Sequence, residues 1–315
     1  TVLTHLTGGS AGREGAALQL GGCLSGSLGR VLRLDDKDER IITMCGMAGG
    51  FSALFGTPLA AAVFAMEVES IGVMYYAALV PCVLSALIAN VISSLFGVAS
   101  TSFTLAAIPE LSAISLLQAI GLGIVFGALA SLFCRAMHIG GTLYKKIENP
   151  YLRIVVGGCI VALLSLLVRS GDYNGAGMSV ISAALAGHAV PWAFALKIVF
   201  TVLTLGAGFK GGEIVPCFFV GATCGCVVAP LLGMDAGFGA ALGLIAVFCG
   251  VTNSPMTSIL LGYELFGGQG LALLAMCAAV SYLLSGYSGL YREQKIIYSK
   301  TSPVFIGRKG GEEKQ

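Results

Sequence analysis

The sequence has 315 residues, of which 56% are hydrophobic and 11% charged, and its formal net charge is +2. A soluble domain carries roughly 25% charged residues, so this composition excludes a soluble domain and indicates an integral membrane protein. No basic stripe is interleaved with aromatic residues, which argues against nucleic acid as a partner.

Apolar stretches that are long enough, or nearly so, to cross about 30 Å of hydrocarbon follow one another along the chain. Three shorter, glycine-rich stretches come first, near Gly15–Leu28, Ile41–Phe55 and Leu54–Val68. Seven more follow, at Ile71–Phe96, Ile114–Met137, Ile154–Val168, Trp192–Gly206, Val215–Leu232, Ala236–Gly250 and Gly270–Ser285. This mixture of lengths predicts an all-α membrane protein with tilted and broken helices rather than a plain bundle. The tail after Lys300 is polar and is expected to fray in water.

Two glutamates stand in an unusual setting. Glu14 lies in "GREGAALQLGG" and Glu213 lies in "GGEIVPCFFVGATCG", each between glycines and an apolar run. A carboxylate at membrane depth costs several kcal/mol unless something stabilises it. Each glutamate opens a predicted helix, where unpaired backbone N–H groups and the helix dipole favour negative charge. A carboxylate or a small anion can occupy such a place.

The surroundings of the two glutamates repeat along the chain. Pro58 precedes Glu67 by nine positions, and Pro255 precedes Glu264 by nine; the motif glutamates precede these prolines by 44 and 42 positions. Ordered landmarks of this kind predict inverted repeats, as in many transporters. The predicted divisions are the remainder of a first repeat (1–95), a second repeat (96–285), a pore-lining C-terminal helix (286–300) and a polar tail (301–315).

The second half has about a hundred residues before its motif glutamate and the first half only 13. The repeat therefore predicts that roughly 80 to 90 residues, including the N-terminal helices, precede Thr1 in the intact protein.

At these motifs the sequence resembles the CLC family of chloride channels and anion/proton antiporters. The resemblance covers Gly8 to about Lys300 and is carried by "GREGA", "FGTPLAAAVFAMEV", "DYNGAGMSVI", "GGEIVPCFFVGATCG" and "SGLYREQ". It implies a CLC-type inverted-repeat fold and a homodimer with one pore per subunit. The subunit interface would run through helices near Leu54–Val68 and Pro255–Leu284. No cofactor is implied.

Departures from the pattern of chloride-type members indicate which branch of the CLC family the sequence resembles. Glu213 stands where chloride-type members have an apolar residue, Val68 stands where chloride/proton antiporters carry an inner proton glutamate, and Ala16 replaces the usual proline. These features resemble the fluoride/proton antiporter branch. They imply fluoride export coupled to proton entry across the inner membrane of a prokaryote. A chloride/proton antiporter and a passive anion channel stay open as alternatives. An intramembrane protease would need a Ser/His or Asp/Asp constellation, and none appears, so the protein is not expected to be an enzyme.

Three side chains are predicted to carry the chemistry. Glu14 can mimic the anion when ionised and leave its site when protonated, or it merely caps a helix. Glu213 is either a second carboxylate of the pathway or a helix-terminal residue facing water; two carboxylates around one ion titrate as a pair. Tyr291 offers a phenolic donor to the anion, unless it is an interfacial tyrosine like its neighbours Tyr287 and Tyr298.

Backbone groups complete the predicted anion site. Glycines let amides approach an ion closely, and small fluoride requires several donors at once. Phe218 and Phe219 line the path with ring edges or belong to the core, and Lys210 attracts anions or is a solvated loop residue. The anion-binding set is Gly12, Arg13, Gly15, Ala16, Gly212, Ile214, Val215, Phe218 and Tyr291.

The remaining polar residues are expected to be structural. The ten cysteines lie in apolar segments, where they act as small buried hydrophobes, and the three histidines are scattered, so no metal site is predicted. Glu67, Glu69 and Glu264 end apolar helices and are expected near water or bonded to neighbouring backbone.

Overall fold

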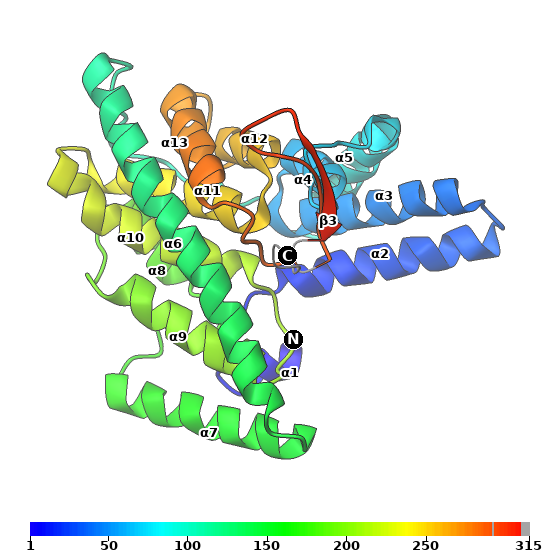
Figure 1. Ribbon diagram of the computed structural model, residues 1–315, viewed down its shortest axis with the longest axis horizontal. Coiled ribbons are helices and arrows are strands. Elements are labelled where there is room, and N and C mark those ends of the chain that lie inside the picture. Colours follow the sequence, from blue (N-terminus) through cyan, green and yellow to red (C-terminus); the bar gives the residue numbers. More distant parts are fainter. Residues whose placement is uncertain (292, 310–315) are drawn as a thin grey trace.

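The structure is a computed structural model that describes residues 1–291 and 293–309, and it is mostly helical (Figure 1). The first half of the chain forms α1 (Val2–Leu6), α2 (Glu14–Val31), α3 (Asp36–Phe55), α4 (Pro58–Glu67), β1 (Ser70–Ile71), the 3-10 helix η1 (Tyr76–Ala78) and α5 (Leu79–Leu95). The second half forms α6 (Ala113–Lys145), α7 (Pro150–Val168), α8 (Met178–Leu185), α9 (Ala193–Gly206), α10 (Ile214–Val228), η2 (Ala229–Leu232), α11 (Ala236–Thr252), α12 (Pro255–Phe266) and α13 (Leu271–Leu284). Strands β2 (Lys295–Tyr298) and β3 (Phe305–Lys309) follow.

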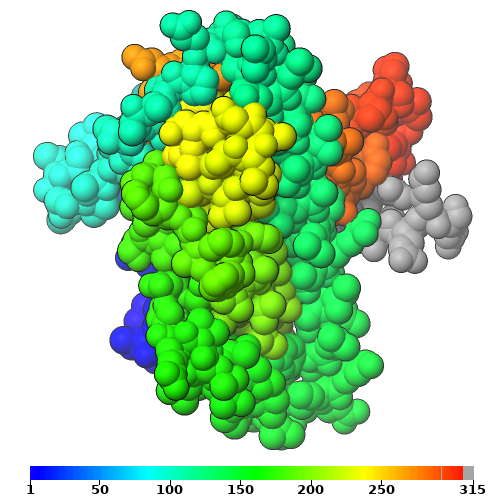
Figure 2. Space-filling view, turned by 90° about the vertical axis from the view of Figure 1, so that its left-hand side faces the viewer, coloured from blue at the N-terminus to red at the C-terminus, as the bar shows by residue number. Residues whose placement is uncertain are grey.

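Helices of very different length are combined, as the sequence predicts. Within the described residues, four are long and apolar enough to cross a membrane: Tyr76–Leu95, Ala113–Lys145, Pro150–Val168 and Ile214–Leu232. Helix α6 alone has 33 residues, which corresponds to about 50 Å; it runs along one face of the molecule, with α7 across its end (Figures 1 and 2). Shorter apolar helices, including α4, α9, α11 and α13, lie between the long ones.

The two halves use the same local signals to shape α3 and α4 on one side and α11 and α12 on the other. Helices α3 and α11 each begin after an aspartate whose carboxylate accepts backbone N–H groups of the first turn, as N-caps do. Each ends on a residue with left-handed backbone, and a proline then opens the next helix. The equivalent residues are Asp35, Gly56 and Pro58 in the first half and Asp235, Asn253 and Pro255 in the second.

Close glycine contacts hold α2 on α3 and α10 on α11. A Cβ atom on Gly21 would overlap the carbonyl of Gly46, and one on Gly221 would overlap the carbonyl of Gly243. Small residues permit such close helix approach in membranes. Helices α10 and α11 are buried along almost their whole length, so the core of the protein lies around them. The order α2 to α5 recurs in α10 to α13, whereas the repeat boundaries at 95 and 285 stay a prediction.

Two parts of the expected secondary structure need correction. The apolar stretch Ile71–Phe96 is not one helix, because β1 and η1 precede α5. The described residues of 286–300 contain no helix; they form a turn and then β2. The alternation of "KIIY", with Ile296 buried and its neighbours more exposed, suits a strand rather than a helix.

The C-terminal tail is also more ordered than expected. Strand β2 pairs parallel with β1 and antiparallel with β3, giving a small sheet in the order β1-β2-β3. Residues 305–309 of the tail therefore form a strand instead of fraying. The rest of the predicted tail, residues 310–315, lies outside the described residues.

Candidate functional site

The two glycine-framed motifs meet although 200 residues separate them. The backbone N–H of Gly12 donates to the carbonyl of Gly212 at 2.8 Å, and the N–H of Gly212 donates to the carbonyl of Gly12 at 2.9 Å. These reciprocal bonds form an isolated antiparallel bridge. The bridge places the first residues of α2 and α10 next to each other.

The Glu14 carboxylate lies at the N-terminus of α10. Glu14 is the first residue of α2 and is fully buried. Its Oε1 accepts the backbone N–H of Val215 at 3.0 Å, and α10 begins one residue earlier, at Ile214. Its Oε2 has no hydrogen-bond partner among the described residues. The carboxylate thus occupies the place that a helix N-terminus offers to an anion.

Gly12 and Gly212 create the room for that carboxylate. A Cβ atom on either residue would overlap the carboxylate oxygens of Glu14. A Cβ atom on Gly15 would lie 3.3 Å from the Cα of Gly212, so the start of α2 packs directly on the second motif. Gly12 and Gly212 are therefore needed for Glu14 to keep this position, whereas a side chain at Gly15 would make only a tight contact.

Glu213 and Tyr291 both interact electrostatically with the Glu14 carboxylate. Glu213 is the half-buried N-cap residue of α10, and its charge interacts with that of Glu14. Its side chain makes no hydrogen bond to the described residues. The Tyr291 hydroxyl interacts electrostatically with both carboxylates. Tyr291 and Gly15 also line a cavity of about 550 Å³ that reaches α3 and α4.

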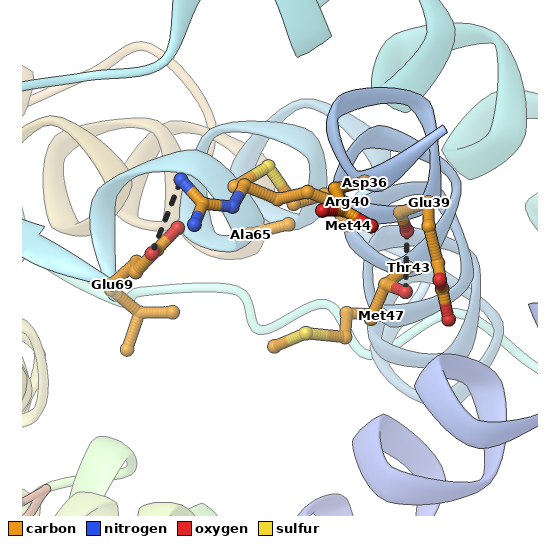
Figure 3. A pocket seen from close by; sticks show the side chains of 9 residues that line it. Asp36, Glu39, Arg40, Thr43, Met44, Met47, Ala65 and Glu69 are labelled. Atoms are coloured by element: carbon orange, nitrogen blue, oxygen red, sulfur yellow. Dashed lines mark hydrogen bonds and ion pairs between the residues drawn. The ribbon is translucent and has the colours of Figure 1, made fainter. Parts of the chain in front are cut away.

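A second, more polar cavity of about 460 Å³ adjoins the first. Both are lined by Thr43, Met47, Val68 and Glu69. Glu69 forms ion pairs with Arg40 at 3.9 Å and with Lys295 at 3.7 Å; Figure 3 shows Arg40 reaching across this cavity to Glu69. Charged groups of both signs therefore line the cavity that adjoins the one beside Tyr291.

Not every predicted residue joins the site. The side chain of Arg13 is exposed, and Ala16 is half-buried on α2. The ring of Phe218 packs against Phe55 and Phe248, with centroids 6.0 and 5.3 Å apart, so it belongs to the aromatic core. Lys210 is exposed and touches the first motif region only through its carbonyl, which accepts from the Thr4 hydroxyl.

Sequence reasoning missed two features near the site. Glu67 and Glu264 do bond to neighbouring backbone, but each bonds to the helix of the opposite half of the chain. Lys197 lies completely buried in α9, and a single lysine within "AFALKIVFTVL" was the available signal for it. In residues 1–291 and 293–309, no three His, Cys, Asp or Glu side chains gather as metal ligands.

Comparison with known proteins identifies similar sequences among chloride channel proteins. The chain matches the voltage gated chloride channel family over residues 1–286. It is 40% identical over 307 residues to a chloride/fluoride channel protein of Pseudomonas syringae pv. tomato, a match that covers 95% of this chain and 68% of that protein. It is 31% identical over 231 residues to a putative chloride channel protein of Ralstonia nicotianae, covering 70% of this chain and 52% of that protein. The chain thus spans about two thirds of the first relative, and the matched region spans about half of the second.

Solved structures share the fold. The crystal structure of a CLC-type fluoride/proton antiporter matches with a TM-score of 0.90 and 38% identity, covering 93% of this chain and 75% of that one. A slow cyanobacterial chloride/proton antiporter matches with a TM-score of 0.77 and 20% identity, covering 90% of this chain and 70% of that one. The second likeness concerns the fold alone.

Proposed function

Because this chain belongs to the voltage-gated chloride channel (CLC) family of membrane channels and transporters, we propose that it exports fluoride in exchange for protons. The chain is a multi-pass membrane protein, and the bacterial origin of its relatives favours the cytoplasmic membrane of a prokaryote. Support for fluoride comes from Glu213 and from the two similar proteins whose names include fluoride.

One observation carries the proposal: the Glu14 carboxylate itself occupies an anion position. It is buried, it accepts the Val215 amide at 3.0 Å, and its second oxygen has no partner in the described part of the chain. An ionised carboxylate and a fluoride ion compete for the same amide. A protonated Glu14 is neutral, so it no longer gains from the helix terminus and leaves the place to the anion.

This competition couples the two ions. When Glu14 takes a proton it releases the site, and when it loses the proton it expels the anion and returns to the Val215 amide. Glu213, whose charge interacts with that of Glu14, is the second carboxylate and passes the proton onward. Glu213 takes this role because Val68, at the position of the inner proton glutamate of chloride/proton antiporters, cannot carry a proton. Tyr291 donates its hydroxyl to the anion as it passes between the site and the cavity at α3 and α4.

Fluoride efflux from liposomes tests the proposal. The protein expressed from its complete gene is reconstituted, and fluoride, chloride and pH are followed with electrodes for the wild type and for Glu14→Gln. We expect fluoride-driven proton movement in the wild type, poor chloride transport, and proton movement at the protein-free level in Glu14→Gln. Glu148→Gln, at an exposed glutamate in the connection between α6 and α7, is the matched control and should behave as wild type.

The other outcomes identify the alternatives. Chloride transport equal to fluoride transport would make the protein a chloride/proton antiporter. Anion flux without proton movement would make it a passive channel, and Glu213 would then lose its assigned role.

We also propose that two subunits associate, each with its own pathway. The helices expected at the subunit interface, α4 and α12, carry exposed apolar side chains. Among them are Leu59 on α4 and Met256 on α12, which occupy equivalent positions after Pro58 and Pro255. A mass of two chains by light scattering in detergent is expected, and a mass of one chain would contradict the association.

A further inference from the structure

Lys197 is a buried lysine that the proposed exchange does not use. Its side chain is 0% exposed, in the middle of the apolar helix α9. A buried ammonium costs several kcal/mol unless hydrogen bonds or an opposite charge compensate it. Its Nζ donates to the carbonyls of Tyr173 at 3.1 Å and Gly175 at 2.8 Å. Among the described residues it forms no ion pair within salt-bridge distance.

The acceptors of Lys197 belong to the segment that supports the first motif. The carbonyl of Gly175 also accepts the N–H of Ala11 at 3.2 Å, and the N–H of Gly175 donates to the carbonyl of Gly9 at 2.9 Å. The amide of Asn174 adds a bond to the carbonyl of Gly8 at 2.7 Å. One carbonyl oxygen therefore joins Lys197 to the backbone three residues before Glu14.

Lys197 also touches the helix that receives the anion. Its Nζ lies 5.0 Å from the ring centroid of Phe219 on α10, a cation–π distance. The Tyr173 ring packs on the same phenylalanine, with centroids 6.2 Å apart. The carboxylate with which Lys197 interacts electrostatically is that of Glu14.

We propose that Lys197 is a positioning residue for the anion site: its buried side chain fixes the Gly175 segment against the first motif, and its protonated form favours negative charge at the position of Glu14. The inference rests on the proposed exchange and adds to it a source of the electrostatic attraction that holds negative charge at the position of Glu14. The amides at the start of α10 supply the local donors, and Lys197 adds a charged group that contacts α10 through the ring of Phe219.

Several charged or titratable groups interact electrostatically with the Glu14 carboxylate. They are His5 from α1, Glu213 and Cys217 at the start of α10, Tyr291 from the C-terminal segment and Lys197 from α9. Lys197 is the one group of this set whose side chain bonds to Gly175, and Gly175 in turn bonds to the backbone of Gly9 and Ala11 just before the first motif. Its removal should therefore change both the charge and the geometry of the site.

The test compares Lys197→Met and Lys197→Arg with wild type in the liposome assay, over a range of pH and fluoride concentration. For Lys197→Met we expect about a tenfold weaker apparent fluoride affinity, and a pH of half-maximal transport about one unit higher, because the ionised site has lost a neighbouring positive charge. Lys197→Arg keeps the charge and should restore the pH of half-maximal transport. Lys146→Met, which removes an exposed lysine at the end of α6, should change neither quantity.

Each result has a distinct meaning. Absence of fluoride/proton exchange in the wild type defeats the proposed function. Normal wild-type exchange with an unchanged pH profile in Lys197→Met defeats the role of Lys197 alone. If Lys197→Met does not fold, Lys197→Arg decides: a shifted profile or lost proton coupling would show that a positive charge at this position does not support the site, which overturns the role of Lys197.

Discussion

At the scale of single residues, the missing side chains of Gly12 and Gly212 matter as much as the carboxylate they enclose. The two glycines bond to each other through their backbones, and Glu14 fills the space where their Cβ atoms would lie. Because the site is made by two segments 200 positions apart, a change in the second motif should act on the glutamate of the first.

Gly212→Ala should therefore displace the Glu14 side chain, although the two residues are far apart in the sequence. The added Cβ overlaps the Glu14 carboxylate, and relieving such overpacking costs about 1–3 kcal/mol. If Glu14 leaves its position, that cost corresponds to about a 5- to 150-fold loss of proton-coupled fluoride transport. Gly141→Ala, at a helical glycine of α6 with open space around it, serves as the control. Full coupling in Gly212→Ala would mean that Glu14 does not need this position.

At the scale of elements, the two halves exchange helix caps. Glu67, the last residue of α4, accepts the backbone N–H groups of Met256 and Thr257 at the start of α12, at 3.0 and 2.8 Å, and the Thr257 hydroxyl. Glu264 of α12 in turn accepts the N–H groups of Leu59 and Ala60 at the start of α4, both at 2.9 Å. Each carboxylate satisfies orphan donors and complements a helix dipole.

Removal of the Glu67 cap should lower the free energy of unfolding more than removal of the Glu264 cap. Glu67→Ala leaves buried donors without partners, a loss of about 1–3 kcal/mol, whereas Glu264 is more exposed and makes one bond fewer, so Glu264→Ala should cost less. Thermal unfolding of the purified protein measures both. Glu69→Ala, which removes only exposed ion pairs, should cost under about 1 kcal/mol. Equal losses for Glu67→Ala and Glu69→Ala would contradict the capping role.

The sequence predicted the positions of helices better than the partners of their side chains. Apolar run length located most helices, and the equal spacing of Pro58–Glu67 and Pro255–Glu264 pointed to equivalent elements. Spacing along the chain says nothing about the partner of a side chain, so the exchange of caps was not foreseen. The same limit explains Arg13, which belongs to the first motif in sequence but is exposed in the structure.

At the scale of the whole molecule, the C-terminal segment connects the two halves and positions Tyr291. Strand β2 pairs with β1 of the first half. The buried Gln294 side chain donates to the carbonyl of Val68 in the first half at 3.0 Å and to that of Thr252 in the second at 2.9 Å. The N–H of Gln294 also bonds to the carbonyl of Tyr291. The phenol is thus held by a turn that leads into β2 rather than by the helix that the sequence suggested.

Gln294→Leu should release Tyr291 while keeping the volume of the side chain. It leaves the carbonyls of Val68 and Thr252 without this donor, which costs about 1–3 kcal/mol for each carbonyl that stays unsatisfied. We expect weaker fluoride transport, and because both changes act through one phenol, the loss in Gln294→Leu/Tyr291→Phe should be less than the sum of the single losses. Gln118→Leu removes a similar but solvent-exposed side chain-to-carbonyl bond at the half-buried Gln118 of α6 and should leave transport unchanged. Strictly additive losses in the double variant would show that Gln294 acts on the fold alone, and Tyr291 would then owe its position to the pairing of β2 with β1.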